Sequence, residues 1–482
     1  MRASQITDII QDANMKGPDI DLTGIRANSA GIRPGEAFIA LKGSITDGHL
    51  YINDAIKAGA QVIICSKGSV KSDLPATTIE VPDTKKALEH LLPIIYPQAG
   101  KPSLIGITGT NGKTTITYII ESILTASGKT TGVLGTINTR YPGTHIESDL
   151  TTPGPLDLFE TLHAMGLAGV DICVMEASSH ALDQDRMAGL KYDCGIFTNL
   201  SQDHLDYHSD MELYFLSKNK LFHQYLNGPA VINIDDPYGR RLCSGLEHAV
   251  TYGRSEKSTI RLTSLHSTPS GLSMDIATPQ GTIHIKSPLL GEINAYNIMA
   301  ATGACFSMGI GTDEVIRGVQ ALKSVPGRMQ LVENSHGLKI IIDYAHTPDA
   351  LRKMLSSARR FTQGRLICIF GCGGNRDKGK RPIMGSIAQD LSDIIIITSD
   401  NPRTEAPDAI IKDILVGIKD GPGIFIEPDR ALAIKKGIES MEKDDCMIVA
   451  GKGHEGYQIV GNTKKTFDDR IITDACLKEV FG

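Results

Sequence analysis

The sequence lacks several features that would place it in a special class of protein. It contains no tryptophan, and no apolar run approaches the roughly 20 residues that a membrane-spanning helix needs. The first residues, "MRASQITDIIQDANMKG", do not include the apolar core of a secretory signal. Low-complexity segments and short internal repeats are also missing. These absences favour a soluble globular protein of the cytoplasm.

Neither the cysteines nor the charges indicate a special partner. The nine cysteines include no C-x-x-C pair, a scatter that is typical of buried thiols in a reducing compartment. The formal net charge of −6 argues against a general nucleic-acid or membrane-surface binder. One local basic cluster, "NRDKGKR" at residues 375–381, is too short to be a binding arm. We therefore expect neither nucleic acid nor membrane among the partners.

Glycine, by contrast, is plentiful. The 49 glycines follow no G-x-y period, so they indicate many tight loops between regular elements, as α/β folds require. A chain of 482 residues is too long for one ordinary core, and about 150 residues per domain predicts three domains. Boundaries are predicted at "YPQAGKPS" (96–103) and "VPGRM" (325–329), which gives domains at 1–98, 99–326 and 327–482.

The hydrophobic pattern predicts an α/β fold in each domain. Residues 1–98 form a small mixed α/β domain, in which the strand-like runs "AFIALKG" and "QVIICS" flank a helix. From Ser103 a strand, a glycine loop and a helix follow one another, and the helix has one apolar stripe made of Ile116, Ile119, Ile120, Ile123 and Leu124. Short apolar runs that alternate with helices predict a mostly parallel sheet in this central domain and a Rossmann-like sheet in the C-terminal domain.

The loop "GITGTNGKTT" (106–115) is typical of a phosphate-binding loop. Gly109 and Gly112 would let backbone N–H groups close on phosphate oxygens, while Lys113 reaches the outer phosphates and Thr114 holds Mg²⁺. The spacing departs from G-x-x-x-x-G-K-[ST], because Ile107 stands where that pattern has its first glycine. A strand before the loop and a helix after it favour nucleotide binding over a simple turn.

Other polar residues near strand ends have roles that the pattern leaves open. Glu176 ends the run "DICVME" as a metal-binding carboxylate would, yet a helix cap or a surface acid fits equally well. His204 and His208 lie four residues apart but lack the glutamate and third ligand of a zinc site, which favours a structural role for His208. Lys218 lies in the amphipathic stretch "MELYFLSKNKLF", where a lysine usually faces solvent.

In the C-terminal domain, polar clusters follow the strand-like runs. Because parallel strands end at one edge of a sheet, these clusters predict a ligand site there. Arg403 in "DNPR" has a planar fork that matches a carboxylate, although a surface arginine that closes a proline turn is the alternative. The clusters are Asp343 with His346, Arg376, Asp400 to Arg403, and Lys452 to Glu455.

A set of motifs, taken in order, resembles that of the Mur ligase family, the ATP-dependent amide-forming enzymes of cell-wall precursor synthesis. Each motif is weak alone, but the ordered set covers essentially the whole chain. The motifs are "GTNGKTT", "TTP", "MEASSHAL", "TNLSQDHLDYH", "LLGEINAYN", "VPGRM", "DYAHTPDAL", "GCGGNRDKGKRP", "DNPRTEAP" and "GKGHEGYQ".

The resemblance implies a ligase of peptidoglycan synthesis with three substrates. ATP would phosphorylate the D-glutamyl side-chain carboxylate of UDP-N-acetylmuramoyl-L-alanyl-D-glutamate. An amine of meso-2,6-diaminopimelate would then attack the acyl phosphate, giving an amide, ADP and phosphate. The implied cofactors are Mg²⁺ at two sites and CO₂ held as a lysine carbamate. The resemblance also implies a monomer with a uridine-binding N-terminal domain, a P-loop ATPase central domain and an amino-acid-binding C-terminal domain.

The resemblance further assigns roles to individual residues. The carbamylated lysine would be Lys218, which reverses the solvent-facing interpretation. Catalysis would depend on Lys113, Glu176, His204 and Lys218, and the metal ligands would be Thr114, Glu176, His204 and the carbamate of Lys218. ATP would be bound by Gly109, Thr110, Asn111, Gly112, Lys113, Thr114, Thr115, Asn297, Arg328, Asp343 and His346.

The two other substrates have their own implied residues. Around Ser29 the chain departs from the family pattern, since "ANSA" lacks the usual aspartate and arginine, and Ser44 stands where some relatives have histidine. The muramoyl-dipeptide nucleotide would be bound by Ser29, Thr151, Thr152, Ser178, Gln184 and Arg186. Diaminopimelate would be bound by Arg376, Asp400, Asn401, Pro402, Arg403, Gly451 and Glu455.

Three alternatives share some of these features. A folylpolyglutamate-type synthetase uses the same loop-and-ligase chemistry but gives no reason for "DNPR". A Mur ligase that accepts lysine is opposed mainly by Arg403. A catalytically silent nucleotide-binding regulator has no chemical need for the four predicted catalytic residues together.

Overall fold

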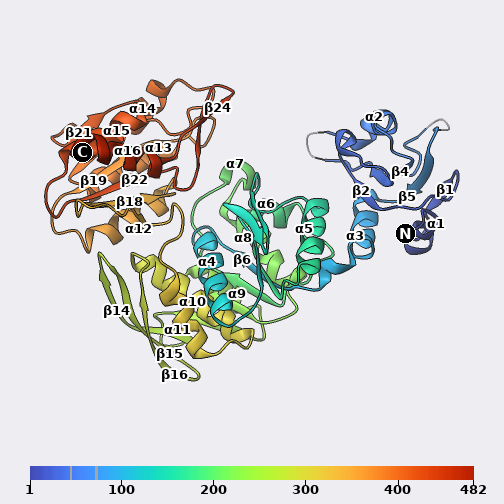
Figure 1. Cartoon of the computed structure of the whole chain (residues 1–482), viewed down its shortest axis with the longest axis horizontal. Helices are drawn as coiled ribbons and strands as arrows, with labels where there is room; N and C mark the ends of the chain where they lie inside the picture. Colours follow the sequence, from blue (N-terminus) through green and yellow to red (C-terminus); the bar gives the residue numbers. More distant parts are fainter. Residues whose placement is uncertain (44–45, 71–73) are drawn as a thin grey trace.

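The chain forms three α/β lobes that follow one another in sequence. The computed structural model describes residues 1–43, 46–70 and 74–482. Figure 1 shows the N-terminal lobe (blue) and the C-terminal lobe (orange to red) on opposite sides of the central lobe. The predicted α/β class is thereby confirmed. Among the helices of the described residues, none combines the length and apolar character needed to cross a bilayer.

The N-terminal lobe is a small mixed α/β unit. Its strands are β1 (Asn14–Lys16), β2 (Gly24–Arg26), β3 (Glu36–Ile39), β4 (Val62–Ser66) and β5 (Thr77–Val81), and its helices are α1 (Ser4–Ile9), α2 (Ile52–Lys57) and α3 (Thr84–Ile95). The sheet order is β1-β5-β4-β3-β2, with β1 antiparallel and the other strands parallel. The two strands and the intervening helix predicted in this region are present.

The central lobe is organised around one large sheet. Its strands are β6 (Ser103–Thr108), β7 (Thr131–Leu134), β8 (Asn138–Tyr141), β9 (Thr144–Glu147), β10 (Ile172–Glu176), β11 (Cys194–Phe197), β12 (Ala230–Asn233), β13 (Ala249–Gly253), β14 (Ile260–Thr268), β15 (Gly271–Thr278) and β16 (Gly281–Ser287). The order is β16-β15-β14-β13-β12-β11-β6-β10-β7-β8-β9. The middle strands are parallel, as predicted. The antiparallel ribbons at both edges are not predicted, because the prediction relies on continuous apolar runs, whereas strands such as β16 alternate exposed and buried residues.

Helices cover this sheet and place the loop that follows β6. They are α4 (Lys113–Ala126), α5 (Pro155–Leu167), α6 (Ser179–Asp183), α7 (Leu205–His208), α8 (Met211–Lys220), α9 (Pro237–Cys243), α10 (Glu292–Ser307) and α11 (Thr312–Ala321). The predicted apolar stripe of α4 is fully buried in a core that includes α10 and the sheet. Burial of this stripe fixes the start of α4 at the carboxyl edge of the sheet.

The C-terminal lobe is a Rossmann-like sheet with helices on both faces. Its strands are β17 (Gln330–Leu331), β18 (Lys339–Asp343), β19 (Leu366–Phe370), β20 (Ile394–Ile397), β21 (Ile424–Ile426) and β22 (Cys446–Ala450), in the order β17-β18-β22-β19-β20-β21, and a hairpin follows with β23 (Tyr457–Val460) and β24 (Thr463–Thr466). Its helices are α12 (Pro348–Arg359), α13 (Lys380–Leu391), α14 (Pro407–Leu415), α15 (Arg430–Ser440) and α16 (Asp469–Phe481). Except for β17, the six-stranded sheet is parallel, so four strand ends with polar residues meet at one edge.

The segment 96–103, expected to be a linker, is packed against the central lobe. It contains the 3-10 turn η3 (Pro97–Gly100), in which Ala99 is buried. A Cβ on Gly166 of α5 would lie 2.1 Å from the carbonyl oxygen of Gln98, so the turn and the helix are in direct contact. The N-terminal and central lobes therefore share one continuous hydrophobic core.

Candidate active site

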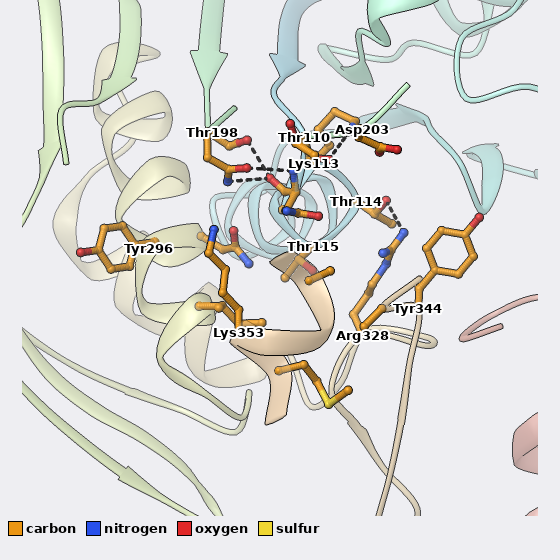
Figure 2. Close-up of a pocket in the computed structure, with 18 of the residues that line it drawn as sticks. Thr110, Lys113, Thr114, Thr115, Thr198, Asp203, Tyr296, Arg328, Tyr344 and Lys353 are labelled. Atoms are coloured by element: carbon orange, nitrogen blue, oxygen red, sulfur yellow. Dashed lines mark hydrogen bonds between the residues drawn. The ribbon is translucent and has the colours of Figure 1, made fainter. Parts of the chain in front are cut away.

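A cavity of about 710 Å³ lies between the central and C-terminal lobes (Figure 2). The central lobe contributes the loop before α4, the ends of β10 and β11, and α10, while the C-terminal lobe contributes residues 328–360. A site at the carboxyl ends of parallel strands is where such sheets bind ligands. Predicted residues that line it are Thr110, Asn111, Gly112, Lys113, Thr114, Thr115, Thr151, Glu176, Ser178, His204, Lys218, Asn297, Arg328, Asp343 and His346.

The loop between β6 and α4 has the backbone shape of an anion-binding loop. Gly109 (φ 139°) and Gly112 (φ 94°) both have positive φ angles, which suit glycine. Neither position has room for a side chain: a Cβ at Gly109 would lie 1.9 Å from Thr198 Oγ1, and one at Gly112 would lie 2.5 Å from Asn297 Oδ1. Because the helix N-terminus adds free N–H groups and a positive dipole, the loop favours phosphate.

Two lysine side chains converge on the carbonyl oxygen of Gly109. Lys113 Nζ donates to it at 3.0 Å and also to the carbonyl oxygen of Thr110 at 2.9 Å. Lys218 Nζ donates to the same Gly109 oxygen at 2.9 Å. Burial lowers the pKa of both lysines, and the charge of Lys113 lowers the pKa of Lys218 further. The Asp203 carboxylate opposes this lowering for both lysines, and the Glu176 carboxylate opposes it for Lys113.

Lys218 is 1% exposed, so the solvent-facing interpretation from its sequence pattern is wrong. Helix α8 buries Tyr214, Phe215, Ser217 and Lys218, and these residues do not form a simple apolar stripe. The Lys218 ammonium lies 4.5 Å from the centre of the Tyr214 ring. Tertiary packing, rather than local pattern, therefore decides which face of α8 is inside.

Glu176 ends β10 as a buried carboxylate with polar neighbours. Its Oε1 accepts hydrogen bonds from Thr114 Oγ1 at 3.0 Å and from the Thr136 backbone N–H at 2.8 Å, and its Oε2 accepts one from Thr136 Oγ1 at 3.0 Å. The side chain is 1% exposed, which excludes the surface-acid alternative. Its side-chain hydrogen bonds run to the Thr114 hydroxyl in the first turn of α4 and to Thr136 after β7, and none of them accepts a backbone N–H group of a helix.

The donor set around Glu176 fits Mg²⁺ bound together with phosphate. Mg²⁺ commonly takes one or two protein oxygens and fills its octahedron with phosphate oxygens and water. Thr114 supplies a hydroxyl and Glu176 a carboxylate beside the phosphate-binding loop. Within the described residues no group of three or more His, Cys, Asp or Glu side chains could hold a metal alone. The chemistry of these donors therefore matches a nucleotide-borne ion.

His204 lies in a group of imidazole and phenol rings. Its ring centroid is 4.9 Å from that of His180 and 6.1 Å from that of Tyr214. Burial lowers the pKa of His204, opposed by the Asp203 carboxylate, so the neutral ring keeps a lone pair for a metal. His208 is buried, and its Nε2 has no hydrogen-bond partner in the described part of the chain.

Residues 328–349 bring the C-terminal lobe to the cavity. Arg328 Nη2 donates to Thr114 Oγ1 at 3.2 Å, and its guanidinium lies 4.6 Å from the Tyr344 ring centre (Figure 2). Asp343 accepts two backbone N–H groups at 2.7 and 2.8 Å, yet burial keeps its pKa above the usual value. His346 Nδ1 lies 2.8 Å from the carbonyl oxygen of Tyr344. The predicted residues of both lobes thus meet around one cavity.

Sequence reasoning missed two groups, one beside this cavity and one that lines it. Asp349 Oδ2 accepts hydrogen bonds from Asn111 Nδ2 at 3.1 Å and Ser201 Oγ at 3.0 Å, and so joins the C-terminal lobe to the phosphate-binding loop. The only signal for it is the acid after the proline that starts α12. Tyr296 Oη donates to Asp235 Oδ2 at 2.8 Å elsewhere in the cavity. That pairing has no sequence signal, because the partners are 61 residues apart.

Most residues expected to bind the muramoyl dipeptide lie together beside Glu176. Thr152 Oγ1 donates to the backbone oxygen of Glu176 at 2.7 Å, and Ser178 N donates to Thr152 Oγ1 at 3.1 Å. Arg186 Nη1 donates to the Thr152 backbone oxygen at 2.9 Å. Thr151 and Gln184 also belong to this group. The Thr151 hydroxyl lies 3.1 Å from Thr136 Oγ1, and Gln184 Oε1 accepts a hydrogen bond from Arg186 Nε at 3.0 Å.

The predicted uridine contact lies in a different lobe. Ser29 starts the 3-10 turn η1 (Ser29–Gly31) and does not line the cavity. The preceding Asn28 caps this turn, accepting the backbone N–H of Ala30 at 3.0 Å. Ser44 is outside the described residues. The structure therefore does not bring Ser29 together with the other residues expected to bind this substrate.

The residues expected to bind diaminopimelate form a second cluster, at the ends of β19, β20 and β22. Arg403, with φ 52°, donates from Nη1 to the carbonyl oxygen of Gly374 at 2.8 Å. Arg376 is exposed and has no hydrogen bond or ion pair within the described ranges. Gly373 lies between these arginines, since a Cβ there would be 3.0 Å from Arg403 Nη1 and 3.8 Å from Arg376 Cγ. The cluster thus offers two guanidinium groups around a glycine.

The acidic side of this cluster is held by internal bonds. Asn401 Nδ2 and Lys452 Nζ both donate to Glu455 Oε2, at 2.8 and 3.1 Å. Asn401 Oδ1 accepts the Ile459 backbone N–H at 2.9 Å. Gly451 leaves room for Asp400, whose Oδ2 would lie 2.7 Å from a Cβ there. Pro402 is buried in the same turn.

Comparisons with known proteins cover the chain nearly end to end. Family models described as Mur ligase family, catalytic domain, Mur ligase middle domain, and Mur ligase, glutamate ligase domain match residues 21–97, 107–305 and 327–453. The UDP-N-acetylmuramoyl-L-alanyl-D-glutamate–2,6-diaminopimelate ligase of Gloeobacter violaceus is 45% identical over 456 residues, covering 94% of this chain and 93% of its own length. An enzyme of that name from Clostridium acetobutylicum is 42% identical over 478 residues, covering 98% and 97%.

Solved structures show the same architecture. A structure of a UDP-N-acetylmuramoyl-L-alanyl-D-glutamate–2,6-diaminopimelate ligase, 31% identical, superposes with a TM-score of 0.72 and covers 100% of this chain and 99% of its own. MurF ligase from Thermotoga maritima in complex with ADP has 20% identity and a TM-score of 0.65, covering 95% and 96%. At that identity the second match concerns the fold alone.

The conformation of Gly112 yields a test of the phosphate-binding loop. Gly112→Ala should weaken ATP binding by roughly tenfold or more, or about 1.4 kcal/mol, because the new Cβ would displace Asn297 and strain a positive φ. The control is Gly128→Ala near the other end of α4, where φ is 76° but no atom lies within 4 Å. Titration calorimetry with ATP measures both. Equal ATP affinity in the two variants would contradict the assignment of this loop.

The comparisons all point to one family. The relatives match over 94% and 98% of this chain. Three models of that family match successive parts of the chain, at residues 21–97, 107–305 and 327–453. The chain belongs to the Mur ligase family of ATP-dependent ligases.

Proposed function

We propose that this chain joins meso-2,6-diaminopimelate to the D-glutamyl side-chain carboxylate of UDP-N-acetylmuramoyl-L-alanyl-D-glutamate, in peptidoglycan precursor synthesis. ATP is the co-substrate, and ADP and phosphate are the other products. The observation that carries the proposal is the full-length match, at 42–45% identity, to relatives with that name. The two site clusters support it, since one suits a nucleotide and the other an amino acid with a distal carboxylate.

The reaction has two steps that need different surroundings. First, a carboxylate oxygen of the D-glutamyl residue takes the γ-phosphoryl group of ATP, and ADP leaves. Next, the lone pair of the neutral diaminopimelate amine attacks the acyl carbon, the carbon–oxygen bond to phosphate breaks, phosphate leaves with the bonding pair, and the nitrogen loses one proton to give the amide. Both steps bring anions together, so cationic side chains have to be present where charge develops.

The residues of the cavity meet this need. Lys113 and Arg328 place positive charge beside the loop that cradles the phosphates. Thr114 and Glu176 would hold Mg²⁺ with the β- and γ-phosphates, and His204 with a carbamate on Lys218 would hold a second ion. When bound, Mg²⁺ supplies charge neutralisation of the phosphoryl group. Asn297, Asp343 and His346 complete the surroundings of the nucleotide.

Lys218 is suited to carbamate formation. Its amine is buried and its pKa is lowered, so a neutral nitrogen is available to attack the carbon of CO₂ with loss of one proton. The product is an anion, which changes the repulsion between Lys218 and Lys113 into an attraction. Burial also protects a carbamate from water. These features support Lys218 as the modified residue.

The UDP-substrate and diaminopimelate have separate surfaces. Thr151, Thr152, Ser178, Gln184 and Arg186 would hold the dipeptide next to Glu176, and Ser29 the uridine end in the N-terminal lobe. Arg376 and Arg403 would bind the distal carboxylate of diaminopimelate, while Asp400 and Glu455 take its ammonium, with Asn401, Pro402 and Gly451 shaping the turn. A cytoplasmic monomer fits a substrate carried on a soluble nucleotide.

The proposed function is tested by amine-dependent phosphate release from ATP in the presence of the UDP-dipeptide. We expect strong release with meso-2,6-diaminopimelate and almost none with lysine, because lysine lacks the carboxylate that pairs with the guanidinium groups. Equal phosphate release with lysine would contradict the proposal that Arg403 binds the distal carboxylate. If none of the amines supports phosphate release, the chain would be a silent nucleotide-binding regulator. If a folate substrate supports release instead, it would be a folylpolyglutamate-type synthetase.

Removal of one guanidinium tests the amino-acid site directly. Arg403→Ala should raise the KM for diaminopimelate by about 10- to 150-fold, the value of one charge-assisted hydrogen bond. ATP and UDP-dipeptide binding should not change, because Arg403 does not line the nucleotide cavity. Arg359→Ala, which removes a half-buried arginine of α12 that is ion-paired with Asp393, is the control. Unchanged steady-state kinetics with diaminopimelate would refute the role of Arg403.

The carbamate on Lys218 is tested by substitution and by isotope labelling. Lys218→Ala should be nearly inactive and partly rescued by short carboxylic acids, which replace the missing anion. Carbon-13 NMR in labelled bicarbonate should show a carbamate signal in the unmodified protein and in Lys412→Ala, a surface control, but not in Lys218→Ala. Because the pKa is lowered, the neutral amine and the signal should persist to lower pH than for an ordinary lysine. Full activity of Lys218→Ala would contradict the assignment.

A further inference from the structure

Arg381 is a fully buried arginine beneath the cluster at the ends of β19 and β20. It lies in the first turn of α13 and is 0% exposed. Nη1 donates to Glu405 Oε2 at 3.0 Å and to Asp413 Oδ2 at 2.7 Å. Nη2 donates to Glu405 Oε1 at 3.0 Å and to the carbonyl oxygen of Gly373 at 3.2 Å. One guanidinium therefore joins the glycine-rich loop 371–377 to the turn 400–405.

The same two segments are joined by further hydrogen bonds. Gly374 N donates to the carbonyl oxygen of Asn401 at 2.9 Å. Asn375 Oδ1 accepts Thr404 Oγ1 at 2.9 Å, and the Asn375 backbone N–H donates to Glu405. The loop and the turn are thus held together along their length, and Arg381 supplies the hydrogen bonds on the buried side.

Backbone strain shows that this alignment has to be held. Asn375 has φ 54° and Arg403 has φ 52°, a region that residues other than glycine rarely occupy. Such conformations persist only where the surrounding structure determines them. Asn375 lies in the loop, directly before Arg376, and Arg403 lies in the turn. The two strained backbone positions therefore set the directions of the Arg376 and Arg403 side chains.

Arg381 does not itself attract the substrate. Its charge is balanced by Glu405 and Asp413, at distances of an ion pair. The Arg381 guanidinium lowers the pKa of Glu405 to about 2, so this carboxylate stays charged at neutral pH. With Arg381 neutralised inside, Arg376 and Arg403 remain as the guanidinium groups that face the ligand.

We propose that Arg381 is a positioning residue for amino-acid specificity. By holding the loop 371–377 against the turn 400–405, it sets the separation of Arg376 and Arg403 so that both meet one distal carboxylate. The ligand class is an amino acid with a second carboxylate, and the inference rests on the proposed function. A bidentate match of this kind depends on fixed geometry rather than on charge alone.

A matched control distinguishes positioning from simple stabilisation. Arg365 precedes β19 at its opposite end, where Nε and Nη2 donate to Asp445 Oδ2 at 3.0 and 2.7 Å and Nη2 donates to the Ser440 carbonyl oxygen at 2.7 Å. It is thus another arginine with a carboxylate and a carbonyl partner on the same sheet. Its removal should lower the melting temperature without affecting the strand ends that bind the amino acid.

The experiment compares steady-state kinetics of Arg381→Met and Arg365→Met, with the unmodified enzyme measured first. Arg381→Met should raise the KM for meso-2,6-diaminopimelate by about tenfold or more, the loss of one oriented charge-assisted contact. The KM values for ATP and the UDP-dipeptide should stay within about twofold, and the ratio of kcat/KM for diaminopimelate to that for lysine should fall. Arg365→Met should leave all three KM values and the ratio unchanged.

Two further variants keep the test decisive if Arg381→Met does not fold. Arg381→Lys retains the charge but cannot bridge both segments, and Glu405→Gln retains the shape but removes the anion. Both should raise the diaminopimelate KM selectively, by less than Arg381→Met. An unchanged KM with only a lower melting temperature, or an equal loss of kcat for every substrate, would overturn the positioning role. No diaminopimelate-dependent phosphate release by the unmodified enzyme would instead refute the proposed function.

Discussion

The convergence of Lys113 and Lys218 on the carbonyl oxygen of Gly109 is the interaction on which the rest of the site depends. One carbonyl oxygen cannot neutralise two ammonium groups in a buried cavity. Burial therefore lowers the pKa of both lysines, and keeping either of them charged requires negative charge nearby. Glu176 supplies part of it, and phosphates and a carbamate would supply the remainder. The absence of a side chain at Gly109 leaves room for Thr198, whose Oγ1 would lie 1.9 Å from a Cβ there. Under the proposed function, the substrates would supply the negative charge that this part of the cavity lacks.

The division of the chain into lobes suits the proposed two-step chemistry. Under that proposal the carboxylate would be activated where the central sheet ends, whereas the amine would be recognised at the strand ends of the C-terminal sheet. Arg328 contacts Thr114, and Asp349 contacts Asn111, so residues of the C-terminal lobe touch the phosphate-binding loop itself. Under the proposed function, the lobe that would carry the amino acid is therefore held directly by the loop that would bind the phosphates.

Local pattern was sufficient for some parts of this protein and insufficient for others. The strands β6, β10 and β11 and the stripe of α4 follow from continuous apolar runs, and the glycine loop follows from its position between them. Lys218 marks a limit, because α8 has no apolar stripe to show that it is buried. Arg381 lies in a cluster of basic residues that predicts solvent exposure, yet its partners Glu405 and Asp413 come 24 and 32 residues later. Only the folded sheet brings such partners together.

The packed turn η3 determines how this protein can be divided into modules. Ala99 and the adjoining face of α5 belong to a core shared by the first two lobes, so a cut near residue 98 would leave apolar surface on both fragments. The C-terminal lobe, by contrast, builds its cores almost entirely from its own residues. The C-terminal lobe is therefore the one that can be separated with the least loss of buried apolar contacts. The N-terminal lobe depends on its neighbour for part of its core.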